Sequence, residues 1–246
     1  MGKSSAARSL LISLGDIFLP RTCLVCGRRL LRHERHLCLC CAEDLPRTYF
    51  FARERHPMAD RFNGMLERYL SAHEPYVRAT ALFFYDGHSG YRRIPQSLKY
   101  QGNLAAGRDF GRLLAEDLAR GAAFADIDCV MPVPLHPLRR WRRGYNQAEI
   151  LARAVAESLG VPCLGGVLRR TRHTRTQTRL GVAEKAANVQ GAFTARPGKI
   201  PPGMRHILLI DDVFTTGATL CACFLALRRV TDARISIATL AFVGSV

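Results

Sequence analysis

Two pairs of cysteines lie near the start of the chain, Cys23-x2-Cys26 and Cys38-x2-Cys41, with eleven residues between the pairs. Each pair has the spacing at which two thiolates bind one tetrahedral ion, and four thiolates together select Zn²⁺. Because protein ligands would fill all four positions, we predict a structural zinc site rather than a catalytic one. The surrounding segment is too small to fold by hydrophobic burial, so we expect the metal to supply its folding energy.

Other residues of this segment leave alternatives open. Gly27 suits a tight turn that brings backbone N–H groups close to the sulfurs, and Cys40 is expected to be a spare cysteine. His33 and His36 lie between the pairs and could replace a thiolate; the pairs could also be buried free thiols or, less plausibly, redox-active. The remaining four of the nine cysteines stand among apolar residues, which is typical of small buried side chains: Cys129, Cys163, Cys221 and Cys223.

A second group of reactive side chains follows the apolar run 206–210. Asp211 and Asp212 come directly after this run, at the carboxyl end of a predicted strand, where open α/β sheets bind ligands. A hydroxyl-rich turn follows and opens a predicted helix; it comprises Thr215, Thr216, Gly217, Ala218 and Thr219. Its N–H groups, hydroxyls and helix N-terminus predict a phosphate cradle, and Gly217 lets a ligand approach the backbone.

The chemistry of this group points to a sugar phosphate. The turn lacks the lysine of a P-loop, which disfavours an ATPase. Two adjacent carboxylates beside a phosphate site can accept hydrogen bonds from the 2- and 3-hydroxyls of a ribose, close to any Mg²⁺ that a diphosphate brings. The alternative is an ordinary strand end with threonine as the helix cap.

Arginines crowd the middle of the chain. The arginine belt, residues 135–180, holds ten Arg, no Lys and two acids, together with Trp141. Such density beside aromatic rings suits a diphosphate or single-stranded nucleic acid, and a solvated basic face is the alternative. The candidate contacts are Lys99, which could also be a plain surface lysine, and Arg142, Arg143, Tyr145, Asn146, Gln147, Arg175 and Gln177.

Alternating strands and helices must position these groups. Strands are predicted over 79–86, 128–135, 191–193, 206–213 and 233–243, and helices over 104–121, 144–160 and 218–230. This alternation favours an α/β fold with a parallel sheet covered by helices on both faces. We divide the chain into an amphipathic N-terminal helix (1–20), the cysteine module (21–50), a connecting segment (51–79) and an α/β domain (80–246).

The net charge of the chain indicates which class of ligand it is suited to bind. The 246 residues carry a formal charge of +16, which favours polyanions or phosphorylated ligands. No apolar run approaches the ~20 residues of a membrane-spanning helix. We expect a cytoplasmic protein whose N-terminal helix either docks on the protein or rests on the inner face of a membrane.

Residues 206–219 resemble the 5-phosphoribosyl 1-diphosphate (PRPP) signature of type I phosphoribosyltransferases. The whole chain resembles the ComF family, phosphoribosyltransferase-like proteins associated with DNA uptake in natural competence. The blocks that carry this resemblance, besides the cysteines and the signature, are Ser97–Gly102, Val133–His136, Arg143–Gln147, Thr176–Gln177 and Asn188–Val189. The chain departs from the family pattern at Cys40, and at Lys185, where the usual arginine would offer a bidentate fork.

The resemblance implies a type I phosphoribosyltransferase-like fold. It also implies that Asp211, Asp212 and residues 215–219 bind PRPP with Mg²⁺, and that the protein handles incoming single-stranded DNA with competence-machinery partners. An active phosphoribosyltransferase, a glycosyltransferase moving the pentosyl group to an acceptor of nucleotide metabolism, is one alternative, but no segment identifies the acceptor. A non-enzymatic adaptor that binds through the cysteine module and the basic surface is the other.

Overall fold

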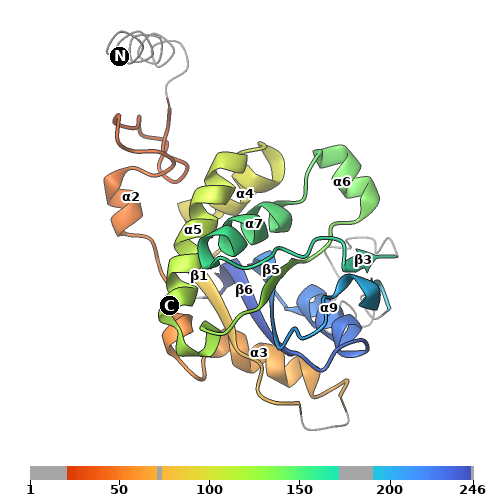
Figure 1. Cartoon of the computed structure of the whole chain (residues 1–246). Helices are drawn as coiled ribbons and strands as arrows, with labels where there is room; N and C mark the ends of the chain where they lie inside the picture. The colour runs from red at the N-terminus through yellow and green to blue at the C-terminus, as the bar shows by residue number, and fades with distance from the viewer. Residues whose placement is uncertain (1–20, 71–73, 172–190, 245–246) are drawn as a thin grey trace, which may run out of the picture.

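The computed structural model describes residues 21–70, 74–171 and 191–244. Its centre is a sheet of four parallel strands in the order β1-β6-β5-β2 (Figure 1). The strands are β1 (Ala79–Tyr85), β2 (Cys129–Pro132), β5 (His206–Phe214) and β6 (Arg234–Val243). The predicted fold class, an α/β protein with a parallel sheet, is confirmed.

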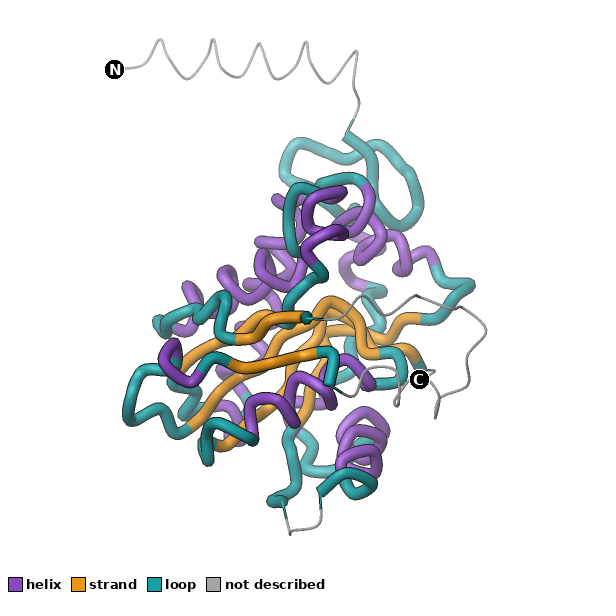
Figure 2. The backbone as a smooth tube through the Cα atoms, turned by 90° about the vertical axis from the view of Figure 1, so that its right-hand side faces the viewer, coloured by secondary structure: helices purple, strands orange, loops and turns teal. Residues whose placement is uncertain are grey.

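Helices cover both faces of the sheet, as Figure 2 shows. The two faces carry α5 (Leu104–Arg120) with α7 (Gln147–Leu159), and α3 (Pro57–Leu66) with α9 (Ala218–Arg228). In β5, Leu208 and Ile210 pack with the first pair of helices, whereas Ile207 and Leu209 pack with the second. Because successive strand residues point to opposite faces, a strand buried on both sides becomes the continuous apolar run seen in the sequence.

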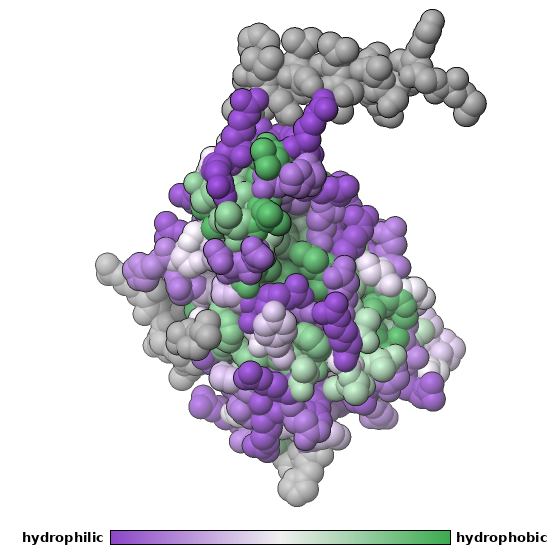
Figure 3. Space-filling model, turned by 90° about the vertical axis from the view of Figure 1, so that its left-hand side faces the viewer, coloured by the Kyte–Doolittle hydropathy of each residue, from purple (hydrophilic) through white to green (hydrophobic). Residues whose placement is uncertain are grey.

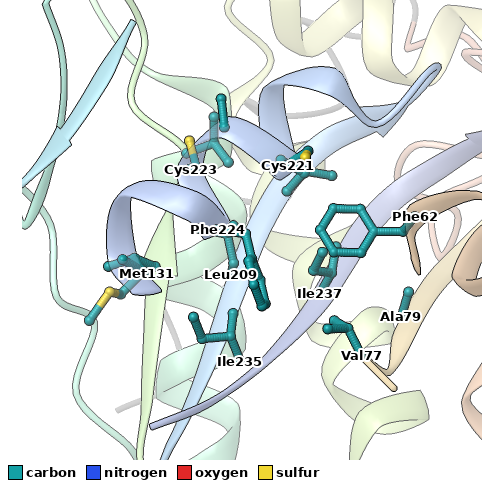
Figure 4. Packing of buried hydrophobic residues seen from close by; sticks show 14 of the residues in the cluster. Phe62, Val77, Ala79, Met131, Leu209, Cys221, Cys223, Phe224, Ile235 and Ile237 are labelled. Carbon is teal, nitrogen blue, oxygen red and sulfur yellow. The ribbon is translucent and has the colours of Figure 1, made fainter. Parts of the chain in front are cut away.

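The second face holds a core of aromatic and aliphatic side chains. Phe62 of α3 and Phe224 of α9 meet edge to face at 5.9 Å between ring centroids. Figure 4 shows these rings with Leu209 and Ile237 of the sheet. This packing holds α3 and α9 against the same face of the sheet.

The interpretation of residues 51–79 as a connecting segment is incomplete. They contain η1 (Phe50–Ala52, which begins one residue earlier) and α3, whose buried Met58, Phe62 and Met65 fall at helical spacing. Pro57 opens α3 at its first position, and the preceding His56 accepts a hydrogen bond from the Ala59 N–H. The apolar stripe of this helix is short and interrupted by charged residues, so the sequence pattern did not predict a helix here.

Two predicted elements begin or end elsewhere. The strand expected over 128–135 stops at Pro132, since Pro134 has no N–H to continue the ladder. The helix expected over 144–160 begins at Gln147, because Gly144 adopts φ +78° and closes a separate helix, α6 (Pro137–Arg143). The predicted stop at Gly160 is confirmed by its left-handed φ of +70°.

The strand predicted over 191–193 lies outside the main sheet. It is β4 (Phe193–Ala195), which pairs antiparallel with β3 (Leu168–Arg170) in a two-stranded sheet. A three-residue strand gives too little pattern to reveal its partner. The remaining short helices are α2 (Leu39–Glu43), η2 (Gly90–Arg92), α4 (Arg93–Tyr100), η3 (Ala122–Phe124) and η4 (Pro197–Lys199).

The cysteine module stands at one end of the α/β body (Figure 1). Arg35 and His36 of the module each lie 3.2 Å from Asp109 of α5. Apolar side chains gather below the module on the face shown in Figure 3, where a hollow of about 490 Å³ has Leu37, Phe110 and Leu113 among its lining residues. The predicted N-terminal helix lies outside the described residues, and within them no helix has the length and apolarity needed to cross a membrane.

Candidate functional site

The acidic pair lies at the carboxyl end of β5, as predicted. Asp212 is 4% exposed, and Lys99 Nζ of α4 lies 3.1 Å from its Oδ2 atom. Apart from this ion pair, the buried Oδ2 atom accepts no hydrogen bond from the described residues. A buried carboxylate oxygen with a single partner is the kind of atom to which a ligand or a cation can bind.

Asp211 has an unusual charge state. Its Oδ1 accepts the Asp212 N–H at 2.8 Å. Burial, followed by the neighbouring Asp212 charge, raises the pKa of Asp211 to about 7, against the opposing charges of Lys99 and Arg170. Near neutral pH this carboxyl group is therefore divided between its neutral and ionised forms, and a bound cation would favour the ionised form.

Lys99 is brought to the acids by α4 (Arg93–Tyr100). Burial lowers the pKa of Lys99, but the charges of Asp212 and Asp211 outweigh burial and leave it above the ordinary value. The Tyr145 hydroxyl donates a hydrogen bond to the Leu98 carbonyl, next to Lys99. The turn before α7 thus holds the end of α4 over the acidic pair.

The hydroxyl-rich turn connects β5 to α9. Gly217 has φ +82°, and a Cβ atom there would lie 2.6 Å from Cζ of Phe214, so the turn requires glycine at this point. The Ala218 N–H donates to Thr216 Oγ1 at 3.4 Å, and the Cys221 N–H donates to the Gly217 carbonyl at 2.8 Å. The turn leads into the N-terminus of α9, and Thr219 lies in the first turn of this helix.

Arg61 of α3 was missed by the sequence analysis. Its Nη1 donates to the Thr215 carbonyl at 3.0 Å and to the Val243 carbonyl at 3.3 Å. A cavity of about 420 Å³ lies here between α3 and the turn, bordered by Arg61, Arg68, Thr215 and Thr216. Arg61 lies in α3 and Arg68 in the turn that follows it, and no local pattern in the sequence pointed to either residue.

Three of the predicted contacts have structural partners. Asn146 caps α7, because its Oδ1 accepts the Ala148 N–H at 3.2 Å, and its Nδ2 donates to the Val133 carbonyl at 2.9 Å. Gln147 Oε1 accepts from Arg143 at 3.2 Å. These side chains build the turn that holds Tyr145. Arg175 and Gln177 lie outside the described residues, as do Thr176, Lys185 and Asn188.

The first part of the arginine belt forms α6, which stands out from the body (Figure 1). Trp141 is 81% exposed on this helix, and Leu138 is 48% exposed. Arg142 is exposed, and Arg140 reaches Glu149 at 3.4 Å. A large ring exposed among guanidinium groups is suited to stacking on a base.

The four predicted zinc ligands form one cluster. The Sγ atoms of Cys23, Cys26, Cys38 and Cys41 all lie within 4.8 Å of one another. Gly27 has φ +76°, as expected for the tight turn. The Arg28 guanidinium donates to Cys38 Sγ at 3.1 Å, and chiefly through this bond the pKa of Cys38 falls to about 6. Four converging sulfurs with a thiolate-favouring donor fit a tetrahedral Zn²⁺.

The other residues considered for the metal lie elsewhere. Cys40 is exposed and does not belong to the cluster, and His36 contacts Asp109. Cys129, Cys221 and Cys223 are buried, and burial raises the pKa of Cys129 and that of Cys221 to about 12. These thiols are small core residues, as the sequence indicated.

Comparison with known proteins gives a consistent group of relatives. No family model matches the chain. Competence protein F of Haemophilus influenzae is 36% identical over 128 residues, 51% of this chain and 56% of that protein. DNA utilization protein YhgH of Salmonella typhi is 30% identical over 51% of this chain and 56% of its own length. Competence protein ComFC of Streptococcus pneumoniae is 30% identical over half of each chain. The chain thus spans about half the length of the curated relatives it matches.

Two solved structures show weaker similarity. Glutamine PRPP amidotransferase from B. subtilis has a TM-score of 0.38 at 21% identity, over 55% of this chain and 26% of that one. Adenine phosphoribosyltransferase from Leishmania donovani has a TM-score of 0.35 at 17% identity, over 78% of this chain and 82% of that one. At these scores neither superposition supports a conclusion by itself.

The parallel sheet, with its acidic pair and hydroxyl-rich turn toward the carboxyl end of β5, defines an α/β protein with an N-terminal four-cysteine cluster. The relatives confirm the resemblance to the ComF family that was drawn from the sequence.

Proposed function

We propose that the protein binds PRPP with Mg²⁺ at the carboxyl end of β5 and acts in DNA uptake. The observation that carries the proposal is the acidic pair near the end of β5, with Asp212 buried and ion-paired to Lys99, two residues before the turn that opens α9. Asp211 and Asp212 would accept from the ribose hydroxyls, and residues 215–219 would hold the 5-phosphate. The names of the relatives, competence protein and DNA utilization protein, support the role in DNA uptake.

Charge around the pair suits a diphosphate. Lys99 lies at Asp212, and Arg170 is among the charges acting on Asp211. When the diphosphate of PRPP brings Mg²⁺, the ion neutralises part of its negative charge beside the two carboxylates. Lys99 can then turn from Asp212 toward the diphosphate, since an ammonium on a flexible stem has three donors to share.

Binding of PRPP and transfer of its phosphoribosyl group to an acceptor have different requirements. A transferase would also need a site for the acceptor, whereas binding needs only the groups named above. The cavity beside Arg61 and Arg68 adjoins the hydroxyl-rich turn and is a space that an acceptor could use. Release of diphosphate with a nucleobase or amine present would show an active phosphoribosyltransferase, and stable PRPP would show a binding protein.

Equilibrium dialysis with labelled PRPP and Mg²⁺ tests the site. We expect one equivalent to bind, ribose 5-phosphate to compete because it keeps the phosphate and the ribose hydroxyls, and Asp211→Asn/Asp212→Asn to lose binding. Asp232→Asn removes an exposed carboxylate elsewhere and is the matched control. PRPP retained by the double variant, or no PRPP bound by the wild type, would overturn the proposal; the second result would favour an adaptor.

We further propose that α6 contacts single-stranded DNA, on the evidence of the exposed Trp141 among arginines. Trp141 is the only tryptophan of the chain, so its fluorescence reports on α6 alone. Stacking on a base should quench it as an oligonucleotide is added. Phe should replace Trp141 with little loss of affinity, and Ala should cost about fivefold or more, since stacking contributes about 1–3 kcal/mol per base. Unchanged fluorescence at saturating DNA would place DNA contact elsewhere.

A further inference from the structure

The cysteine module contacts the turn that precedes α4. The Tyr91 hydroxyl donates to the Cys41 carbonyl at 3.1 Å, and the Arg93 guanidinium donates to the Val25 carbonyl at 3.2 Å. Gly90 packs so closely that a Cβ atom there would lie 2.9 Å from the Val25 oxygen. Both acceptors are backbone atoms of the metal-binding knuckles: Val25 lies in the first, 23–26, and Cys41 in the second, 38–41.

These contacts fix the start of a short helix whose end reaches the acidic pair. Helix α4 begins at Arg93, directly after η2 (Gly90–Arg92), and Lys99 lies in its last turn. Ile94 and Leu98 are buried on the inner side of α4. The Tyr145 hydroxyl donates a hydrogen bond to the Leu98 carbonyl and so holds the end of the helix. Eight residues make a marginal helix by themselves, so its position depends on what holds each end.

The carbonyl groups of Val25 and Cys41 have fixed positions only when the two knuckles that contain them are rigid. A bound metal closes each pair of cysteines into a rigid loop and so fixes the carbonyls within it. Without the metal the two knuckles are joined only by contacts such as the Arg28–Cys38 bond and the hydrogen bond from the Leu24 N–H to the His36 carbonyl, and we expect the two acceptors to lose their defined positions.

We propose that Tyr91 and Arg93 are positioning residues through which the metal-bound cysteine module holds α4, and therefore Lys99, beside Asp212. Metal loading at one end of the protein thus sets ligand affinity at the sheet edge. The part that concerns affinity rests on the proposed PRPP site, whereas the part that concerns α4 does not.

Amide hydrogen exchange tests the support of α4 without any ligand. In the zinc-loaded full chain, Tyr91→Phe/Arg93→Gln should speed exchange over residues 93–100 by about tenfold while zinc content stays at one equivalent. Removing zinc from the wild type should produce the same change in α4, with α7 unaffected. Arg92→Gln is the matched control, because Arg92 donates to Gly87 rather than to the module. Unchanged α4 exchange on zinc removal, or in the double variant, would overturn the proposal.

A double-mutant cycle tests the path through Lys99. Tyr91→Phe/Arg93→Gln should weaken PRPP binding about threefold to tenfold in the wild-type background and not at all with Lys99→Met present. An equal loss in both backgrounds would contradict the path through Lys99. If the wild type bound no PRPP, the proposed function would fail, and the exchange experiment would still decide whether the module supports α4.

Discussion

Asp211 is the residue at which the site departs most from ordinary behaviour. Its carboxyl group shares a buried corner with Asp212, and its raised pKa, about 7, means that folding disfavours the ionised form. In the unfolded chain the group titrates near 3.9. Between these two values the folded protein binds more protons than the unfolded chain, so this group's contribution to stability falls as pH rises toward 7.

Asp211→Asn should therefore stabilise the unliganded protein at neutral pH. We expect little difference from wild type at pH 4, and a gain of a few kcal/mol, at most about 4 kcal/mol, at pH 8, because the amide removes the cost of burying a charge. Urea unfolding at several pH values measures this gain, with Asp232→Asn as the control. A variant less stable than wild type at pH 8 would show that the carboxylate is stabilised in the fold.

The connection between β5 and α9 is the element on which the site depends. Two features require glycine at position 217: its positive φ, and the ring of Phe214, which leaves no space for a Cβ atom. A side chain there must shift the turn or the ring, and either shift displaces the N–H groups proposed to hold a phosphate.

Gly217→Ala should destabilise the protein by about 1–3 kcal/mol and weaken PRPP binding. Gly64 provides a control, because it lies inside α3 with open space around its would-be Cβ atom, and Gly64→Ala should be neutral or stabilise by up to about 1 kcal/mol. Urea midpoints compare the two variants. Equal stability of Gly217→Ala and wild type would mean that the turn tolerates a side chain.

Elements with strong local patterns could be predicted from the sequence, and contacts between distant segments could not. The apolar run before Asp211 predicted β5, and the paired cysteines predicted the four-cysteine cluster, because each of these signals lies within a few residues of sequence. The Lys99–Asp212 and Arg61–Thr215 contacts join segments 113 and 154 residues apart, and no local spacing predicts them. Helix α6 was missed because its short run of arginines has no apolar stripe.

The whole molecule joins a metal-stabilised module to a body with its own core. The chain after α2 already belongs to the body: the Thr48 N–H donates to the Leu82 carbonyl at 3.2 Å, and the Phe84 N–H donates to Pro46 at 2.8 Å. The sheet and the helices on its two faces bury two large apolar clusters, and the module adds only partly buried residues to one of them: Leu24, Val25 and Leu37. Folding of the two parts can therefore be separated.

Chelation of zinc should unfold the cysteine module up to about α2 and leave the sheet intact. Limited proteolysis should then cut within residues 21–43, while the circular dichroism of the body persists. Cys38→Ser should resemble the chelated protein, and Cys40→Ser should keep one zinc. Protein that is purified without metal and resists protease over 21–43 would show that the module folds without the metal.

Net charge predicts how DNA binding responds to salt. With +16 on the chain, contacts to phosphates should make the logarithm of the association constant fall with the logarithm of salt concentration, by about 0.7 per phosphate neutralised. Arg139→Gln/Arg142→Gln should remove about 1–2 phosphate contacts, reduce the steepness of this slope accordingly, and leave the zinc content unchanged. An association constant that does not change with salt concentration would exclude the arginine belt as a DNA surface.

Calorimetric titration of PRPP with Mg²⁺ into the full chain tests the central claim most directly, because it reports affinity and stoichiometry together. We predict one site per chain in the wild type and in Asp232→Asn, and no detectable binding in Asp211→Asn/Asp212→Asn. Absence of binding to the wild type, or equal binding by the double variant, would contradict a phosphoribosyl site at the carboxyl end of β5.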